Sequence, residues 1–256
     1  MKKEQKAQTA QFIEQQLKIE KFETRALKDL LRYYNTAKSG VERDIKKSIK
    51  KNINYPSNER LRRVYKEVDG MIHVLTDKLT KLAAGAVGEV GSYSYSDTNR
   101  ILSWDRRVEG FNNVSRSPAQ IASMVQDEKL GGKYLDDWLW SAMKAENGAL
   151  KAEVAAAQLR GVGYSKLMGE LSGRYKNLVN STEVKRNLET VTKSYIQSAN
   201  AKTHEDIYEA NKDIINKIEW SAILETGNTK TGRGTCPRCM ALDGQTYHST
   251  KSAPPC

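Results

Sequence analysis

Two cysteines near the end of the sequence, Cys236 and Cys239, are separated by two residues. A Cys-x-x-Cys turn can direct both thiolates at one metal ion, and a structural zinc site needs four ligands in a tetrahedron. The further candidates in this part of the sequence are Cys256, which the Pro254-Pro255 pair returns toward the knuckle, and His248. The spacing therefore favours a structural zinc knuckle built from Cys236, Cys239, Cys256 and His248.

The cysteine pair also allows a redox role or simple packing. Cys-Pro-Arg-Cys superficially resembles a redox pair, but that chemistry needs an apolar strand before the pair and a helix N-terminus beneath it. The residues before the pair, Thr229 to Gly234, are polar and loop-like instead. In the packing alternative, the thiols bind nothing and only fill space.

The residues on either side of the knuckle have the alternation of strands. Ile218, Trp220, Ala222 and Leu224 occur at every second position, and Gln245 to His248 follow the turn residues Asp243 and Gly244. This pattern predicts two short strands that hold the knuckle between them, with Gly244 serving the turn.

The rest of the chain has helical periodicity. We expect a long helix over residues 4–37, a break at Ser39-Gly40, a second helix over 41–53 and a third from Ser57 or Asn58 to about Val90. Residues 91–115 lose the pattern and predict an irregular linker. Further helices are expected after Ser117, over Leu135 to Arg160 and over Ser181 to Asn211.

The predicted fold is therefore mainly α, with a small C-terminal β and zinc-knuckle-like element (α+β). Its regions are a basic long-helix region (1–90), an irregular linker (91–115) and a domain that ends in the knuckle (116–256). The longest apolar runs are a few residues, whereas a membrane-spanning helix needs about 20; no membrane-spanning segment is expected. The odd number of cysteines, 3, argues against a disulfide framework and for synthesis in a reducing cytoplasm.

Positive charge is concentrated in the first quarter of the chain. Residues 1–66 hold 18 of the 42 Lys+Arg but only 8 of the 31 Asp+Glu, and the whole chain has a net charge of +11. Without a base-reading motif, such a cluster predicts sequence-independent contact with the phosphates of double-stranded DNA. A solvated charged face or an acidic protein partner are the alternatives. The candidate DNA-binding residues are Lys46, Lys47, Lys50, Lys51, Arg60, Arg62 and Arg63.

The C-terminal half resembles the phage Mu protein F-like family, the phage head morphogenesis or minor head proteins. That family shows a helical body, a Trp-bearing strand, a Cys-x-x-Cys-x-x-Leu-Asp-Gly knuckle and a closing Pro-Pro-x-His-Pro-x-Cys-Arg-Cys segment, of which this sequence contains the Pro-Pro pair. The resemblance covers roughly residues 120–256. The matching residues are Trp220, Cys236, Cys239, Leu242, Asp243, Gly244, Pro254 and Pro255.

This resemblance implies a minor capsid protein that is carried inside the capsid near the portal and made in the bacterial host cytoplasm. Its partners would be the portal protein, scaffold or major capsid proteins, and packaged DNA. Its roles would be head assembly and genome delivery.

No catalytic motif accompanies these features, so no enzyme is expected. The sequence has no His-Glu-x-x-His, no Gly-x-Ser-x-Gly and no P-loop. His73 is expected on the flank of a helix and His204 on a solvated face. Glu205 and Asp206 are adjacent and so point in different directions on a helix. The alternative function is a cellular nucleic-acid-binding protein with a zinc knuckle; a nuclease within the helical body is the third class.

Overall fold

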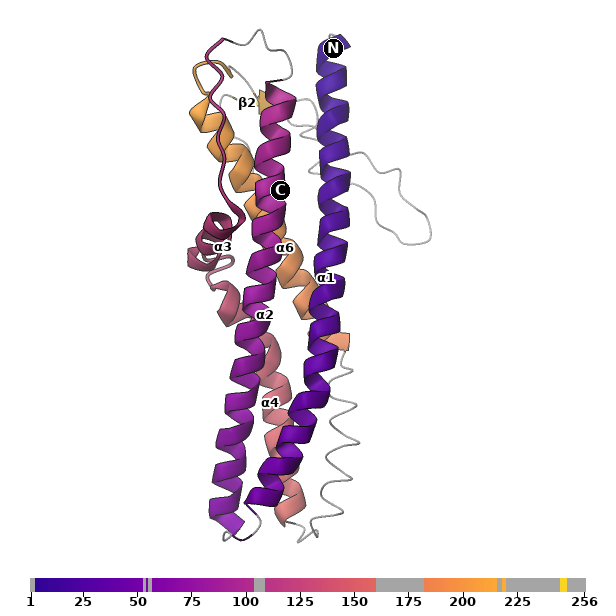
Figure 1. The fold of residues 1–256 in the computed structure, drawn as a ribbon, viewed down its shortest axis with the longest axis vertical. Coiled ribbons are helices and arrows are strands. Elements are labelled where there is room, and N and C mark those ends of the chain that lie inside the picture. Colours follow the sequence, from indigo (N-terminus) through magenta and orange to yellow (C-terminus); the bar gives the residue numbers. More distant parts are fainter. Residues whose placement is uncertain are drawn as a thin grey trace, which may run out of the picture. The chain divides into compact units, whose positions relative to one another are not determined.

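The computed structural model describes residues 3–52, 54, 57–103, 109–159, 182–215, 218–219 and 245–247. In this part of the chain the protein is mainly helical, as predicted (Figure 1). Within these described residues, no helix is both long and apolar enough to cross a membrane. The elements are α1 (Lys3–Lys51), α2 (Ser57–Leu102), α3 (Pro118–Asp127), α4 (Leu135–Leu159), α6 (Thr182–Ala210), β1 (Ile218–Glu219) and β2 (Thr246–Tyr247).

The chain forms two compact units, each assembled from segments that are distant in sequence. Unit 1 comprises residues 1–21, 89–117 and 198–256, and unit 2 comprises residues 22–88 and 118–197. The predicted regions 1–90, 91–115 and 116–256 do not coincide with these units. The reason is that α1, α2 and α6 each supply residues to both units.

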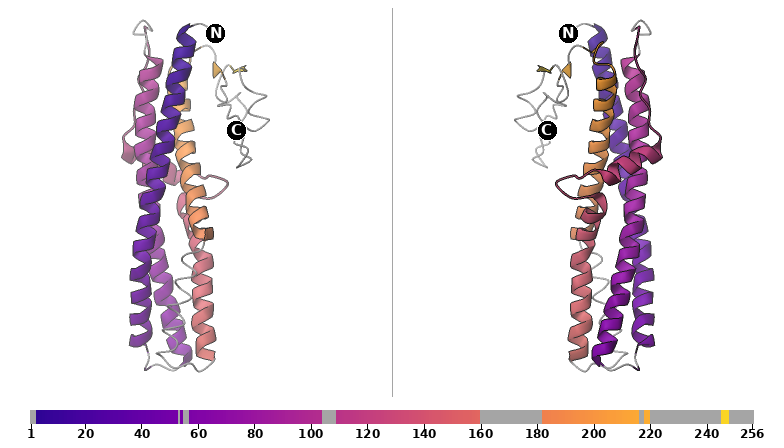
Figure 2. Two further views of the ribbon diagram at one scale, coloured as in Figure 1. Left: turned by 90° about the vertical axis from the view of Figure 1, so that its right-hand side faces the viewer. Right: turned by 90° about the vertical axis from the view of Figure 1, so that its left-hand side faces the viewer.

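The predicted break at Ser39-Gly40 is wrong, because α1 continues through both residues to Lys51 (Figure 2). A glycine inside a helix costs only about 1 kcal/mol relative to alanine. The apolar stripe stays in register across it, since Tyr34, Val41, Ile45 and Ile49 are all buried. Burial of one such side chain stabilises the fold by about 1.5–3 kcal/mol, which outweighs the cost of the glycine.

The prediction of an irregular segment from residue 91 is also wrong, because α2 extends to Leu102. The sequence there is polar, but its buried polar side chains have hydrogen-bond partners within unit 1. The Gln15 amide of α1 donates to the carbonyl oxygen of Ser94 at 3.3 Å and to Oγ1 of Thr98 at 2.9 Å. Ser94 in turn donates to the Asn200 side chain of α6. Buried polar groups with such partners are compatible with a helix.

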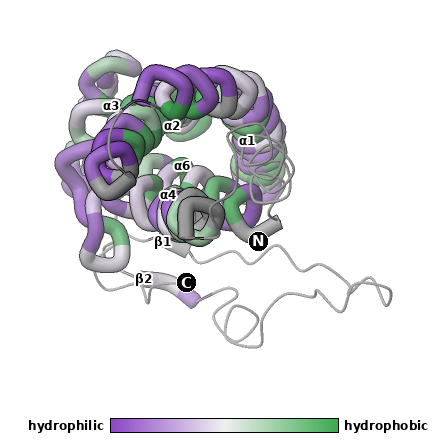
Figure 3. Tube along the Cα trace, turned by 90° about the horizontal axis from the view of Figure 1, so that it is seen from below, coloured by the Kyte–Doolittle hydropathy of each residue, from purple (hydrophilic) through white to green (hydrophobic). Residues whose placement is uncertain are grey.

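Unit 2 is organised around α1 and α2, which form a helical hairpin. At the end of α1, the Asn52 amide donates to Oε1 of Glu67 on α2 at 3.4 Å. Both helices contain hydrophobic as well as hydrophilic residues, as the colours of Figure 3 show. An amphipathic helix buries its hydrophobic side. The buried apolar residues of α2 in this unit are Val64, Val68, Ile72, Leu75, Leu79, Ala83, Ala84 and Val87.

The short helix α3 begins where α2 carries a glycine. A Cβ atom added to Gly88 would lie 3.0 Å from the carbonyl carbon of Pro118 and closer still to its oxygen. The absence of a side chain at Gly88 therefore lets the first residue of α3 approach the backbone of α2. α3 ends at Asp127. Gly131 and Gly132, with positive φ angles of 58° and 82°, instead form the turn between the bridged residues Leu130 and Lys133, just before α4.

Replacement of this glycine gives a test of the α2–α3 contact. We expect Gly88→Ala to destabilise the protein by about 1–3 kcal/mol, the usual cost of overpacking a well-packed site. Gly85→Ala is the matched control, because a Cβ atom at Gly85 meets nothing within 4 Å. It should stabilise the same helix by about 0.5–1 kcal/mol. Both values come from urea unfolding; equal effects of the two substitutions would contradict the close approach.

In unit 1 an extended segment, residues 111–117, is held to α2 and to the end of α6 by side chains. The side chain of Asn99 donates to the carbonyl oxygen of Val114 and accepts a hydrogen bond from the backbone N–H of Val114 at 3.3 Å. The backbone N–H of Asn112 donates to the side-chain oxygen of Asn211 at 2.7 Å, and the side-chain amide of Asn211 donates to the backbone carbonyl oxygen of Asn112 at 2.9 Å. These bonds satisfy backbone groups that no strand or helix pairs.

The two short strands of unit 1 pair with one another. In the antiparallel sheet β1–β2, Ile218 lies opposite Tyr247 and Glu219 opposite Thr246. Residues 220–244 lie outside the described part of the chain.

Candidate functional site

The predicted DNA-binding residues lie at one end of the α1–α2 hairpin in unit 2. The last turns of α1 and the first turns of α2 meet at one end of the hairpin (Figure 1). The former contain four lysines and the latter three arginines. The structure thus brings together two groups that are separated by the turn around residue 54. We call Lys46, Lys47, Lys50, Lys51, Arg60, Arg62 and Arg63 the basic hairpin end.

Three members of the basic hairpin end form ion pairs with neighbouring carboxylates. The distances are 3.3 Å for Lys47–Asp44, 3.9 Å for Lys51–Glu67 and 2.8 Å for Arg63–Glu59. These pairs are solvent-exposed, and exposed pairs contribute only about 0–1 kcal/mol. A polyanion can therefore compete for these cations at little cost.

Lys50 and Arg62 differ from the other five basic residues. Both are exposed and form no ion pair with the described residues, whereas Lys46 and Arg60 are half-buried. Lys50 and Arg62 are therefore the most accessible cations for a phosphate group.

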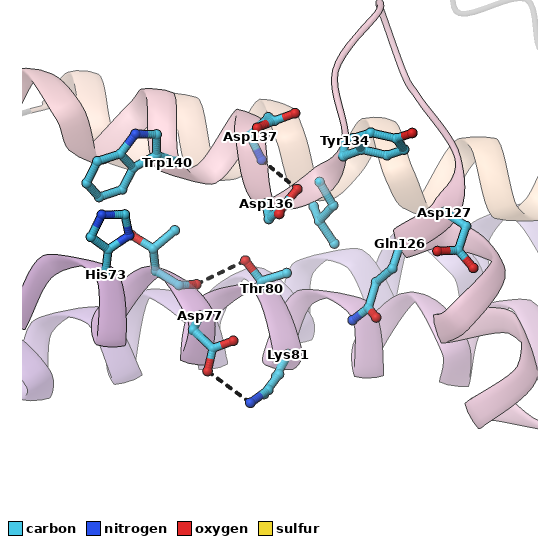
Figure 4. A pocket seen from close by; sticks show the side chains of 12 residues that line it. His73, Asp77, Thr80, Lys81, Gln126, Asp127, Tyr134, Asp136, Asp137 and Trp140 are labelled. Carbon is cyan, nitrogen blue, oxygen red and sulfur yellow. Dashed lines mark hydrogen bonds and ion pairs between the residues drawn. The ribbon is translucent and has the colours of Figure 1, made fainter. Parts of the chain in front are cut away.

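A pocket of about 730 Å³ opens elsewhere in unit 2, between α2, the end of α3 and the start of α4 (Figure 4). One end of its wall is aromatic, because His73 stacks on Trp140 with ring centroids 4.0 Å apart and planes 10° apart. His73 is an exposed residue of α2, in agreement with the predicted position on the flank of a helix. The other polar lining residues are Thr76, Asp77, Thr80, Lys81, Gln126, Asp127, Tyr134, Asp136 and Asp137.

Sequence reasoning missed this pocket. Its residues come from 73–81, 126–127 and 134–140, and no spacing rule connects these three ranges. The one available signal is the acidic start of the predicted helix at Leu135, where Asp136 and Asp137 are adjacent. That pattern is also typical of any helix N-terminus.

Unit 1 contains a polar cluster that combines Tyr95, Arg116 and Asp206. The Tyr95 hydroxyl donates to Oδ2 of Asp206, and the Arg116 guanidinium donates to the same oxygen at 2.8 and 3.0 Å. Burial raises the pKa of Tyr95 to about 12, and the hydrogen bond to Asp206 adds to this shift. Glu205 pairs instead with Lys202 at 2.8 Å. Lys202 also lies 3.8 Å from Oδ1 of Asp206, so the two adjacent carboxylates share this ammonium group.

The prediction of a solvated His204 is wrong. Its ring contacts Phe12 of α1 edge-on and Tyr208 one turn along α6, with centroid distances of 6.0 Å in both cases. Its Nε2 atom is buried and has no hydrogen-bond partner in the part of the chain that the structure describes. Burial lowers the pKa of His204 to about 4, because the charged imidazolium would lose its hydration without a compensating partner.

This buried histidine makes the stability of the protein depend on pH. Unfolded, His204 takes up a proton near its ordinary pKa of 6.5, whereas the folded protein resists protonation down to about 4. The free energy of unfolding therefore has its full value above pH 6.5. It decreases by about 3 kcal/mol in total as the pH falls toward 4, because protonation of His204 favours the unfolded state. We expect His204→Phe to remove this part of the pH dependence.

Urea unfolding between pH 7 and pH 4 measures this effect as the difference between the variant and the wild type. His73→Phe is the control, because His73 is exposed and a phenyl ring keeps its stack on Trp140. The pH dependence that His204 contributes should remain in this variant. A wild-type slope that persists in His204→Phe would contradict the assignment.

The predicted metal ligands Cys236, Cys239, His248 and Cys256 lie outside the described residues, as do the other residues of the knuckle pattern. Among the residues that are described, no group of three or more His, Cys, Asp or Glu side chains is arranged to hold a metal ion. The β1–β2 pairing brings Glu219 and Thr246 together, and these residues flank the segment that contains both cysteines of the pair.

Comparisons of the chain with protein-family models, with curated proteins and with solved structures found no match.

Proposed function

We propose that this protein is a phage minor head protein that contacts packaged DNA without sequence specificity through the basic hairpin end. The observation that carries the DNA contact is the gathering of seven cations at one end of the α1–α2 hairpin, two of them exposed and without an ion pair among the described residues. The assignment to the head is supported by the Cys-x-x-Cys-x-x-Leu-Asp-Gly segment and by the helical body that precedes it.

The geometry of the basic hairpin end suits phosphates better than bases. Lysine and arginine side chains on two helices of a hairpin present mobile point charges, and such contacts follow the DNA backbone. Each neutralised phosphate releases a condensed counterion, so that binding weakens steeply as salt increases. A protein inside a capsid meets DNA of every sequence, and this mode of binding serves that requirement.

The proposal includes a structural zinc ion at the knuckle, held by Cys236 and Cys239 with Cys256 and His248 as the remaining ligands. Its support is the antiparallel pairing of β1 and β2, which closes the chain on both sides of the cysteine pair. Two-residue strands bury too little surface to be stable alone. A metal ion bound by the cysteine pair between the two strands would stabilise this small sheet.

The DNA contact is tested with a double variant of the two exposed cations. We expect Lys50→Ala/Arg62→Ala to weaken binding to duplex DNA and to lower the slope of log K against log salt by about 1.8, since each phosphate contact contributes about 0.9. The matched control is Lys78→Ala/Arg186→Ala, which removes two exposed cations of the same types elsewhere in unit 2.

Fluorescence anisotropy with a short duplex between about 50 and 200 mM salt, the range in which such binding changes steeply, measures both quantities. The control variant should retain the wild-type slope. An equal loss in both variants would indicate a general effect of net charge, and no duplex binding at the lowest salt would contradict the DNA contact.

The assignment to the head is tested on particles. We expect mass spectrometry of gradient-purified particles from the host that encodes this chain to detect it together with a portal protein. Protease should leave it intact in closed particles and digest it once they are opened, because an internal protein is shielded by the capsid shell. Its absence from particles that contain the portal, or digestion in closed particles, would contradict the proposal.

A further inference from the structure

The cations of α1 continue from the basic hairpin end along the exposed side of this helix. Within unit 2, lysine and arginine residues recur every three or four positions, apart from one gap that Thr36 and Ser39 occupy. At 3.6 residues per turn, these cations lie within about 60° of one direction around the helix axis, and all of them are exposed. We call Arg25, Lys28, Arg32, Arg43, Lys47 and Lys50 the α1 stripe.

Burial of the opposite side of α1 fixes the direction of the α1 stripe. The buried apolar residues of this helix in unit 2 are Leu30, Tyr34, Val41, Ile45 and Ile49. They lie within about 60° of the direction opposite to the stripe. Rotation of the helix would expose these side chains to water, which is unfavourable. The fold therefore holds the cations of the stripe toward the solvent.

Only part of this positive charge is neutralised by the fold. Arg32 pairs with Asp29 at 3.1 Å and Lys47 pairs with Asp44 at 3.3 Å, and both pairs are exposed. The other four cations of the stripe form no ion pair with a described residue. Because exposed ion pairs contribute little to stability, a polyanion can displace the two carboxylates at low cost.

A groove of about 910 Å³ opens along the same part of α1. Its lining includes Lys28, Arg32 and Arg43, and it includes no carboxylate among the described residues. Leu27 and Leu31 contribute apolar parts of the wall. A cleft with one sign of charge and walls of low dielectric constant focuses the field on the solution in front of it. The groove therefore strengthens the attraction of the stripe for an anionic partner.

The composition of this side of α1 favours a polyphosphate over an acidic protein. Protein interfaces depend on large apolar or aromatic anchors near their centre. Among the described residues, however, no large apolar side chain of α1 is exposed after Leu17. Contacts with phosphates need only cations and hydrogen-bond donors. The exposed side of α1 in unit 2 thus has the charge for DNA but lacks the anchors for a protein.

The length of the α1 stripe matches a substantial segment of duplex. From residue 25 to residue 50 the helix rises by roughly 37 Å at about 1.5 Å per residue. This length corresponds to about 11 base pairs, since successive phosphates of one strand are spaced by about 3.4 Å along the axis. A duplex is straight over such a distance, because its persistence length is about 150 base pairs.

We propose that duplex DNA lies along α1 of unit 2 and contacts the whole α1 stripe, so that the basic hairpin end is one end of a longer footprint. This inference rests on the proposed contact with DNA and adds the course and the length of the interface. The contacts are with phosphates, because the stripe contains no side chain arranged to read bases.

Fluorescence anisotropy of the full chain with a duplex of about 20 base pairs, between about 50 and 200 mM salt, tests the proposal. We expect Lys28→Ala/Arg43→Ala to weaken binding by about tenfold at the lowest salt and to lower the slope of log K against log salt by about 1.8. Both substitutions lie outside the basic hairpin end, and alanine preserves the helix. The matched control, Lys78→Ala/Arg186→Ala, should retain the wild-type slope, because it removes exposed cations elsewhere in unit 2.

Chemical modification of the wild-type protein gives a second measurement that needs no substitution. A saturating duplex should slow the acetylation of Lys28 severalfold, as measured by mass spectrometry after treatment with an acetyl succinimide ester. The exposed Lys78 is the internal control and should react at an unchanged rate. Unchanged acetylation of Lys28 while the duplex is bound would overturn the proposal.

The variants separate this inference from the proposed function. A wild-type slope in Lys28→Ala/Arg43→Ala together with a lowered slope in Lys50→Ala/Arg62→Ala would confine the contact to the basic hairpin end and would overturn only the present inference. No duplex binding by the wild type would contradict both. Tighter binding of poly-glutamate than of the duplex at equal charge concentration would overturn the inference in favour of an acidic protein partner.

Discussion

The structure depends on the burial of one side of α2. In unit 2 this helix buries a continuous series of aliphatic residues from Val64 to Val87, while in unit 1 its buried side changes to Ser94, Tyr95, Thr98 and Ile101. The aliphatic part provides a non-directional driving force, and the polar part provides directional hydrogen bonds. The basic hairpin end, the acidic pocket and the contacts of the 111–117 segment are all built in part on this helix.

The two charged features of unit 2 coexist because they are spaced along α2. Arg63 and Asp77 are 14 residues apart on one continuous helix, which corresponds to roughly 20 Å at 1.5 Å per residue. The Debye length is about 10 Å at 0.1 M salt, so each feature is largely screened from the other. The charges of the two features therefore act largely independently of one another.

Unit 1 relies on a different balance of forces. Few of its contacts are broad apolar surfaces; instead, side-chain amides and one arginine fasten the 111–117 segment to α2 and α6. Two buried side-chain atoms depart from this satisfaction of polar groups, because Gln11 Oε1 and His204 Nε2 have no hydrogen-bond partner among the described residues. A buried polar group without a partner costs about 1–3 kcal/mol, and at His204 the lowered pKa makes this cost depend on pH.

The sequence by itself determined the helices whose apolar residues recur every three or four positions, including the starts of α3 and α4 and nearly all of α6. It also located the basic residues of the hairpin end, because charge and chain order are local properties. Only the tertiary structure decided that Ser39-Gly40 and residues 91–102 remain helical, that His204 is buried, and that three distant ranges enclose an acidic pocket. The physical reason is that burial of a continuous stripe outweighs a weak local breaker, and that polar side chains acquire hydrogen-bond partners only from segments far away in the chain.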